Sequence, residues 1–129
     1  MTAALTLQEA VRAALRGTPA LAGWPVVDGA DGGTPLPYVG IGPDMVRSIG
    51  GTGVRLHRHR FAVTLWMAGA AVSRLKPAMA EAERAVLLLQ PDLGEARLVR
   101  LSFLRSETRR DARAGAVSGS IDFEAVIEG

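Results

Sequence analysis

The chain has 129 residues and a mass of 13.6 kDa, which suits one domain over 1–129 and leaves too little for two separate cores. Hydrophobic residues make up 48% and charged residues 22%, and the absence of cysteine excludes a disulfide framework, a thiol nucleophile and a cysteine zinc site. The net charge is only +2, and the longest apolar stretch, 61–72, is far shorter than the ~20 residues of a membrane span.

The N-terminal residues lack the basic segment of a secretory signal, since Gln8 and Glu9 follow at once. We therefore expect a cytoplasmic origin and no membrane partner.

Charge is distributed unevenly along the chain. No carboxylate falls between Asp44 and Glu81, whereas this interval contains Arg47, Arg55, Arg58, Arg60, Arg74 and Lys76. A second concentration of arginine spans 97–113, and the last residues are acidic, with Asp122, Glu124 and Glu128. Segregated charge favours a surface that meets a complementary surface. A GC-rich genome would also produce an arginine-rich, lysine-poor chain.

The first predicted element is a helix that begins at a capping box formed by Thr6 and Glu9. Gly17 is a natural end for it, because Pro19 prevents continuation. Its apolar residues recur at the spacing of one helical face: Leu7, Ala10, Val11, Ala14 and Leu15.

Glycine, proline and aspartate dominate 20–37, which indicates turns and loops with a short edge strand over 24–27. A second short strand is predicted over 38–41. The segment 44–53 has no clear period and three glycines, so we predict a flexible loop.

The segment 58–67 alternates cleanly, with one apolar face formed by Phe61, Val63, Leu65 and Met67. This pattern predicts a central strand. A second helix is expected to begin near Ser73 or Lys76, with Ser73 as its cap, and to end before Pro91. Its buried stripe consists of Leu75, Met79, Ala82, Val86 and Leu89.

Two strands, 98–104 and 117–127, are predicted to form a hairpin with a long polar connection over 105–115. On the first of them, Val99, Leu101 and Phe103 are expected to share a face. The order of elements predicts an α+β fold: a single two-layer domain with a mainly antiparallel sheet of four to five strands and two helices packed on one face.

The candidates for chemistry are weak. His57 and His59 would share a strand face and could reach one metal ion, but no third ligand lies near in sequence. We interpret this pair as a solvated or interface strand end. The serines at 118 and 120 lie in a strand rather than in a nucleophile elbow, and 50–53 lacks the lysine of a phosphate loop.

Nucleic-acid binding has the arginine clusters in its favour, because guanidinium groups contact phosphates. The modest net charge and the lack of a recognition helix oppose it. We expect no catalytic site, cofactor or metal, and no sequence-specific DNA binding.

An ordered set of short motifs covers nearly the whole chain. In sequence order these are 18–21 (Thr-Pro-Ala-Leu), 27–29 (Val-Asp-Gly), 35–42 (Pro-Leu-Pro-Tyr-Val-Gly-Ile-Gly), 59–66 (His-Arg-Phe-Ala-Val-Thr-Leu-Trp) and 119–125 (Gly-Ser-Ile-Asp-Phe-Glu-Ala). With its leading helix, alanine-rich second helix and closing hairpin, the chain resembles the tail-terminator or tail-completion proteins of long-tailed phages and phage-derived gene transfer agents.

The resemblance implies a structural protein of a virion or virus-like particle tail, assembled in the bacterial cytoplasm. A ring of about six copies would cap the tail tube protein and meet a head-side connector or stopper protein, while DNA passes through the channel. The alternatives are a component of the head–tail connector ring and, far behind, a small enzyme or a metal- or nucleic-acid-binding module. The loop 44–53 carries no family motif.

We predict that charged residues form the contacts between copies or with a partner, the arginines facing the acidic residues of an adjacent copy. The predicted interface residues are Arg55, Arg58, Arg60, Arg105, Arg109, Arg110, Arg113, Asp122, Glu124 and Glu128.

Overall fold

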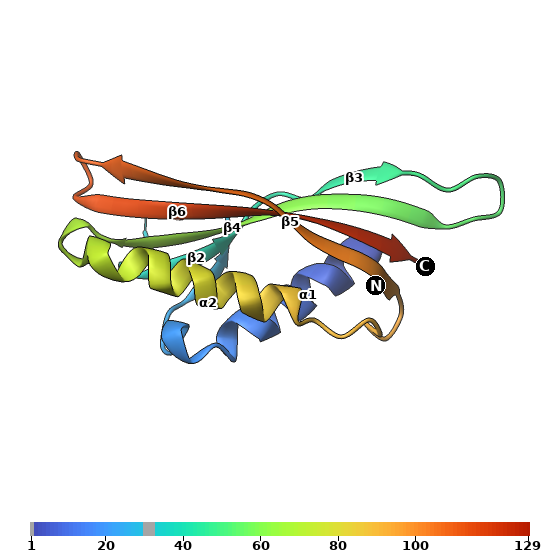
Figure 1. The fold of residues 1–129 in the computed structure, drawn as a ribbon, viewed down its shortest axis with the longest axis horizontal. Coiled ribbons are helices and arrows are strands. Elements are labelled where there is room, and N and C mark those ends of the chain that lie inside the picture. The colour runs from blue at the N-terminus through green and yellow to red at the C-terminus, as the bar shows by residue number, and fades with distance from the viewer. Residues whose placement is uncertain (1, 30–32) are drawn as a thin grey trace.

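Two helices lie on one face of a long, twisted sheet (Figure 1). The computed structural model describes residues 2–29 and 33–129; Met1 and residues 30–32, which belong to the predicted loop 20–37, lie outside them. In chain order the helices and strands are α1 (Ala3–Arg16), β1 (Val26–Asp28), β2 (Tyr38–Ile41), β3 (Met45–Ser48), β4 (Leu56–Ala68), α2 (Leu75–Leu87), β5 (Arg97–Asp111) and β6 (Ala116–Glu128). Short 3₁₀ helices occur at Pro19–Leu21 and Gly69–Arg74.

The sheet has the strand order β1-β2-β4-β6-β5, and β3 pairs with the part of β4 that β2 leaves uncovered. The pair β1–β2 is parallel and the other pairs are antiparallel. The predicted α+β class and mainly antiparallel sheet are confirmed. Among the described residues the strands number six rather than four to five, and the unexpected one is β3.

Helix α1 begins one turn earlier than predicted. Thr2 is its cap, and the Thr2 side chain accepts a hydrogen bond from the Leu5 N–H at 3.2 Å. Thr6 lies inside the helix and donates to the Thr2 carbonyl at 3.0 Å, so the predicted capping box is wrong. The preceding alanines favour helix and extend it backwards. Gly17 ends the helix as predicted.

Helix α2 begins at Leu75, between the two predicted starts, and Pro77 stands in its first turn as expected. The predicted Ser73 cap is wrong, because Ser73 belongs to the 3₁₀ helix that precedes α2. The predicted stripe is confirmed: Leu75, Met79, Ala82 and Val86 are buried, and Leu89 is partly buried.

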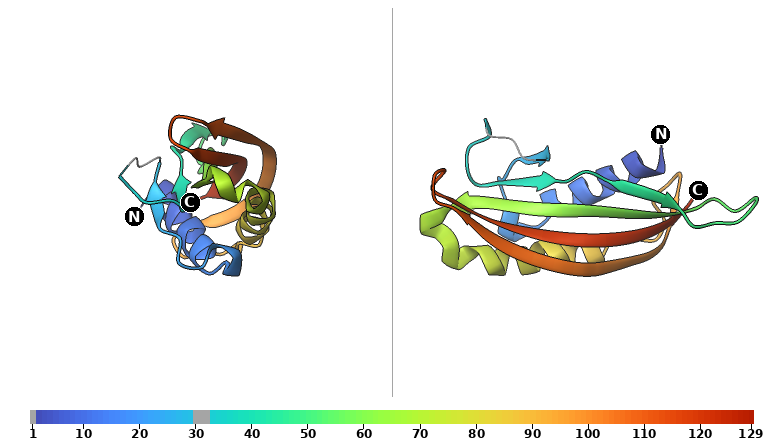
Figure 2. Two further views of the ribbon diagram at one scale, coloured as in Figure 1. Left: turned by 90° about the vertical axis from the view of Figure 1, so that its left-hand side faces the viewer. Right: turned by 90° about the horizontal axis from the view of Figure 1, so that it is seen from above.

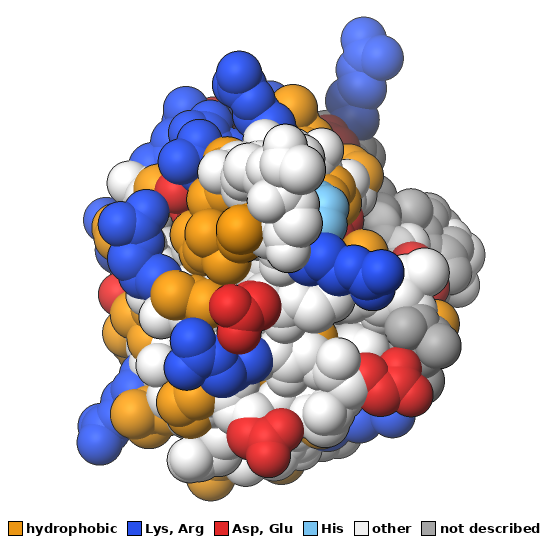
Figure 3. All heavy atoms as spheres, turned by 90° about the vertical axis from the view of Figure 1, so that its right-hand side faces the viewer, with side chains coloured by type: hydrophobic (Ala, Val, Ile, Leu, Met, Phe, Trp, Pro, Cys, Tyr) orange, Lys and Arg blue, Asp and Glu red, His pale blue; other side chains and the backbone are white. Residues whose placement is uncertain are grey.

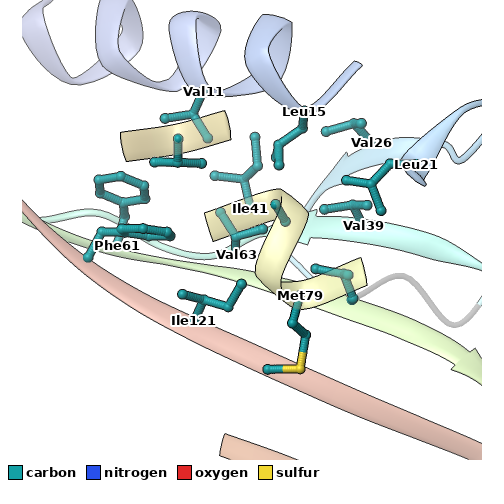
Figure 4. Close-up of a cluster of buried hydrophobic side chains, with 14 of the residues drawn as sticks. Val11, Leu15, Leu21, Val26, Val39, Ile41, Phe61, Val63, Met79 and Ile121 are labelled. Atoms are coloured by element: carbon teal, nitrogen blue, oxygen red, sulfur yellow. The ribbon is translucent and has the colours of Figure 1, made fainter. Parts of the chain in front are cut away.

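The core lies between the helices and the sheet, as Figure 4 shows for side chains from both layers. The predicted alternation of β4 is confirmed, since Phe61, Val63, Leu65 and Met67 are all buried. The Phe61 and Phe123 rings stack with their centroids 5.4 Å apart. None of the helices in the described ranges is long and apolar enough to cross a membrane.

Strands β5 and β6 form a hairpin much longer than predicted. Residues 105–111, expected to be a polar connection, continue β5 opposite 116–122, and only 112–115 form the turn. The register skips Val99 and Leu104, which therefore bulge out of the ladder. Leu101 and Phe103 pair with Ala125 and Phe123, whereas Val99 is bulged and 47% exposed, so the prediction that all three share a face is wrong for Val99.

The segment 44–53 was predicted as a flexible loop, which is wrong for its first half. Residues 45–48 form β3, in the register Met45↔Arg60 to Ser48↔His57. The chain then turns over 51–54, where the Val54 N–H donates to the Gly51 carbonyl at 3.0 Å. The Gly129 N–H donates to the Arg55 carbonyl at 3.0 Å, and past this contact the end of the β3–β4 hairpin projects beyond the two helices (Figures 1 and 2).

Candidate interaction surface

One face of the sheet is not covered by the helices, and it carries many of the charged side chains of the strands. Residues paired across antiparallel strands point to the same side, so the register assigns them to this face. Its basic members are Arg47, Arg58, Arg60, Arg97, Arg100, Arg105 and Arg109, and its acidic members are Glu107, Asp111, Asp122, Glu124 and Glu128. Sequence reasoning found most of these residues but not that one face unites them.

Glu124 lies at the centre of this charged face. Its carboxylate is within ion-pair distance of Arg60 at 3.1 Å, Arg58 at 3.3 Å and Arg100 at 3.5 Å. The Glu124 side chain is only 11% exposed, whereas the three arginines reach further into solvent. One carboxylate therefore neutralises part of the charge of three guanidinium groups, and a positive excess remains.

Two more carboxylates of the predicted acidic row also have partners in their own chain. Arg97 lies 3.4 Å from Glu128, and Arg105 lies 3.5 Å from Asp122. The structure thus brings the predicted basic and acidic residues together within one copy. Their predicted pairing between copies stays a prediction, in competition with these contacts.

Glu107 lies between two arginines of the same strand, with Arg105 Nη2 at 2.5 Å and Arg109 Nε at 2.6 Å. The hydrogen bond and positive charge of Arg109, helped by those of Arg105, hold the pKa of the Glu107 carboxyl below its ordinary value. This row lies at the far end of β5 from Arg97.

Arg55, Arg110 and Arg113 are exposed, and they form no ion pair with the residues that the structure describes. Arg55 lies in the turn of the β3–β4 hairpin, while Arg110 and Arg113 lie near the β5–β6 turn. They therefore occupy opposite ends of the sheet and cannot act as one patch.

The β3–β4 hairpin exposes apolar side chains that sequence reasoning missed. Met45 is 70% exposed, Val54 51%, Val46 50% and Ile49 36%. Apolar residues recur through 45–54, but without a period they did not distinguish a strand from a loop. Together with Arg47, Arg58 and Arg60, Met45 and Val46 line a cavity of about 200 Å³.

Of the histidine pair predicted to form a solvated or interface strand end, His57 is partly exposed near the start of β4, but His59 is not solvated. His59 is 1% exposed because it shares the helix-facing side of β4 with Phe61. Its Nδ1 lies 2.9 Å from Asp44 Oδ2, and its Nε2 has no hydrogen-bond partner in the part of the chain that the structure describes. In the ranges 2–29 and 33–129 no three histidine or carboxylate side chains are grouped to hold a metal ion.

The family model for tail completion protein gp17 matches residues 9–128. The chain belongs to this family. A chain of a solved structure described as "Virion of native gene transfer agent (GTA) particle" is also similar, with 31% sequence identity and a TM-score of 0.79. The alignment covers 98% of this chain and 97% of that chain. No curated protein sequence gives a significant match.

Membership of the tail-completion family confirms the predicted resemblance and its structural class of function. The protein is a structural component of a tail of the phage or gene-transfer-agent type, where it assembles with other tail and head components. The charged sheet face and the exposed hairpin are its candidate surfaces for that assembly.

Proposed function

We propose that this protein is a tail terminator and not an enzyme. About six copies would form a ring that caps the finished tail tube and presents a surface to the head-side connector. The observation that carries the proposal is the family match over residues 9–128, together with the likeness to a chain of a gene transfer agent particle over nearly its full length.

Arginines at the two ends of the sheet and on its uncovered face support a role in assembly. The predicted interface residues Arg55, Arg110 and Arg113 lack ion-pair partners among the described residues and are available to neighbours. Arg58, Arg60 and Arg100 share a single carboxylate, which leaves charge for an acidic partner. In this proposal Glu124 contributes mainly by organising those arginines, and Asp122 and Glu128 do the same for Arg105 and Arg97.

The uncovered sheet face also suits a channel through which DNA passes. Its arginines outnumber its carboxylates, so it would attract phosphates without reading sequence. The ring would assemble on the tail in the bacterial cytoplasm before the head joins it.

Deletion of the gene, followed by electron microscopy of the particles that remain, tests the proposal. Overlong tails or tails that never join heads are expected, because nothing would close the tube. Complementation with the intact gene is the control. Tails of normal length that lack only heads would identify a connector instead, and normal particles would contradict both roles.

A further inference from the structure

Two edges of the sheet are open, and they lie at opposite sides of it. Among the described strands, β3 pairs only with β4, and β5 pairs only with β6. The remaining edge, at β1, is partly closed, because Arg12 donates to the Val26 carbonyl at 2.7 Å. An edge strand carries unused backbone groups and is therefore a place where another chain can add a strand.

The open edge of β3 is formed by Val46 and Ser48. Alternate residues of an antiparallel strand direct their backbone N–H and C=O groups to opposite sides. The Ile49 N–H donates to the Leu56 carbonyl at 2.9 Å, so by register Val46 and Ser48 direct these groups away from β4. Val46 pairs with His59, so both side chains lie on the helix-facing side. Figure 3, which looks at the hairpin end of the molecule, shows basic and hydrophobic side chains side by side.

Three residues of β5 form its open edge: Ser106, Thr108 and Arg110. The Gly129 N–H donates to the Arg55 carbonyl, so the odd-numbered residues of β6 bond to β4. The three residues of β5 lie opposite odd-numbered residues of β6, and therefore direct their own backbone groups away from β6.

Only the second half of β5 offers a regular edge. The bulges at Val99 and Leu104 interrupt the ladder before it, and the Leu98 N–H already donates to the Pro91 carbonyl at 2.7 Å. Over 105–111 no register shift occurs. In the described residues, no backbone hydrogen bond from outside the sheet reaches this segment, so it is available to a further strand.

We propose that β3 of one copy pairs antiparallel with residues 105–111 of β5 in the next copy, with Val46 opposite Thr108. This inference rests on the proposed ring, in which each copy joins its neighbours through two different patches. The strands β3, β4, β6 and β5 alternate in direction and are even in number, so the antiparallel alternation continues from one copy to the next. The uncovered charged face then stays on one side of the ring wall.

Charge selects this register. With Val46 opposite Thr108, Arg47 lies opposite Glu107 on the uncovered face. A shift by two residues in either direction would place Arg47 opposite an arginine of β5 instead, and like charges directly opposite each other destabilise a strand pair. Arg47 has no ion-pair partner in the described residues. The cluster around Glu124 shows that one carboxylate of this face accommodates three guanidinium groups.

The helix-facing side of the new strand pair would meet a cavity of about 410 Å³ between α2 and β5. Met79 and Ala80 line this cavity from α2, and Ser106 and Thr108 line it from β5. Val46, which is half exposed in a single copy, would cover Met79 and Ala80 and so bury apolar surface.

The offset between the two edges suits a closed ring. By register, Val46 lies level with His59 of β4, and Thr108 lies level with Leu65. The next copy is therefore displaced by about six residues, or about 20 Å, along the strands. Over four strands about 4.8 Å apart, this offset gives a strand tilt of about 45°, which is typical of closed barrels.

Cross-linking in assembled particles tests the pairing directly, since the chain has no cysteine of its own. Particles that carry Val46→Cys and Thr108→Cys together are oxidised, so that disulfides form between positions that lie opposite each other. We expect a ladder of covalent multimers of this chain. The matched control combines Val46→Cys with Val72→Cys, which is 45% exposed in the 3₁₀ helix before α2, and should give no ladder.

Particles that contain the double variant but give no product between copies would overturn the strand pairing, and so would an equal ladder from the control. Absence of the unmutated chain from purified particles would instead contradict the proposed function itself, so the two failures are distinguishable.

Proline supplies a second test that does not depend on cysteine placement. Thr108→Pro removes an N–H that points away from β6, so the purified chain should keep its circular dichroism spectrum while its incorporation into particles is lost. Thr108→Ala keeps the N–H and is the control, with incorporation unchanged. Full incorporation of the proline variant would overturn the proposal. Unfolding of the proline variant would also overturn it, because the N–H would then bond within the copy.

Discussion

Arg60 lies directly opposite Glu124 in the register of β4 and β6, and its Nε donates to the Glu124 carboxylate at 3.1 Å. The same carboxylate is close to Arg58 of β4 and Arg100 of β5. One nearly buried glutamate of β6 therefore positions arginine side chains of both neighbouring strands. The arrangement of the charged face therefore depends on an interaction within the chain.

Removal of the Glu124 charge should destabilise the fold. In Glu124→Gln three arginines lose the carboxylate that they share, and we expect the free energy of unfolding to fall by about 1–3 kcal/mol, between the values for exposed and buried pairs. Unfolding in urea measures this change in the free energy of unfolding. Glu128→Gln, where the pair with Arg97 is more than half exposed, is the control and should change stability by less than about 0.5 kcal/mol. Equal effects would contradict a central role for Glu124.

Gly40 in β2 has no room for a side chain. A Cβ at this position would lie 2.1 Å from the Gly29 carbonyl oxygen, which is backbone and cannot rotate away. Gly40→Ala should therefore displace β1 and lower the free energy of unfolding by roughly 1–3 kcal/mol. Gly51→Ala, where no atom lies within 4 Å of the new Cβ, should be neutral. Thermal unfolding compares the stability of the two variants. A Gly40→Ala protein as stable as the original would contradict the close contact between Gly40 and the Gly29 carbonyl.

The lowered pKa of Glu107 makes a prediction about pH. Because the ionised form is favoured in the folded protein, the contacts with Arg105 and Arg109 stabilise the fold above the ordinary Glu pKa of about 4.3, and this stabilisation is lost as the pH falls through the lowered folded value. In Arg109→Gln, which removes the largest cause, the Glu107 titration midpoint should move upward in side-chain NMR. Arg113→Gln is the control and should leave the Glu107 midpoint unchanged. An unchanged midpoint in Arg109→Gln would show that Arg109 does not lower the pKa of Glu107.

Asp44 satisfies one ring nitrogen of the buried His59. In Asp44→Ala both ring nitrogens would lack partners, since Nε2 has none already, and the unfolding free energy should fall by about 1–3 kcal/mol. Asp44→Asn keeps an acceptor oxygen and should lose less than half as much. Chemical unfolding monitored by tryptophan fluorescence compares them, and identical losses would exclude the hydrogen bond as the cause.

The sequence predicted those elements that bury one side against the core. The alternation of Phe61, Val63 and Leu65, and the helical spacing of Leu75, Met79 and Ala82, follow directly from burial in two layers. The family resemblance rested on short motifs, one of which, 59–66, contains this alternation, and the comparisons confirmed it.

The strand segments that were not predicted from the sequence bury few apolar side chains. Strand β3 is exposed on all four residues, so only its pairing with 57–60 defines it. The second half of β5 is an edge strand with a polar outer side, so 105–111 lacked an apolar period. The Glu124 cluster depends on cross-strand register between residues 64 positions apart, which local patterns cannot supply.

Localisation of this chain in intact particles tests the central claim most directly. Cryo-electron microscopy of the tail should show a ring of about six copies of this fold between the end of the tail tube and the head-side connector. Density for the chain elsewhere in the particle, or its absence from tails that are complete and joined to heads, would contradict the account.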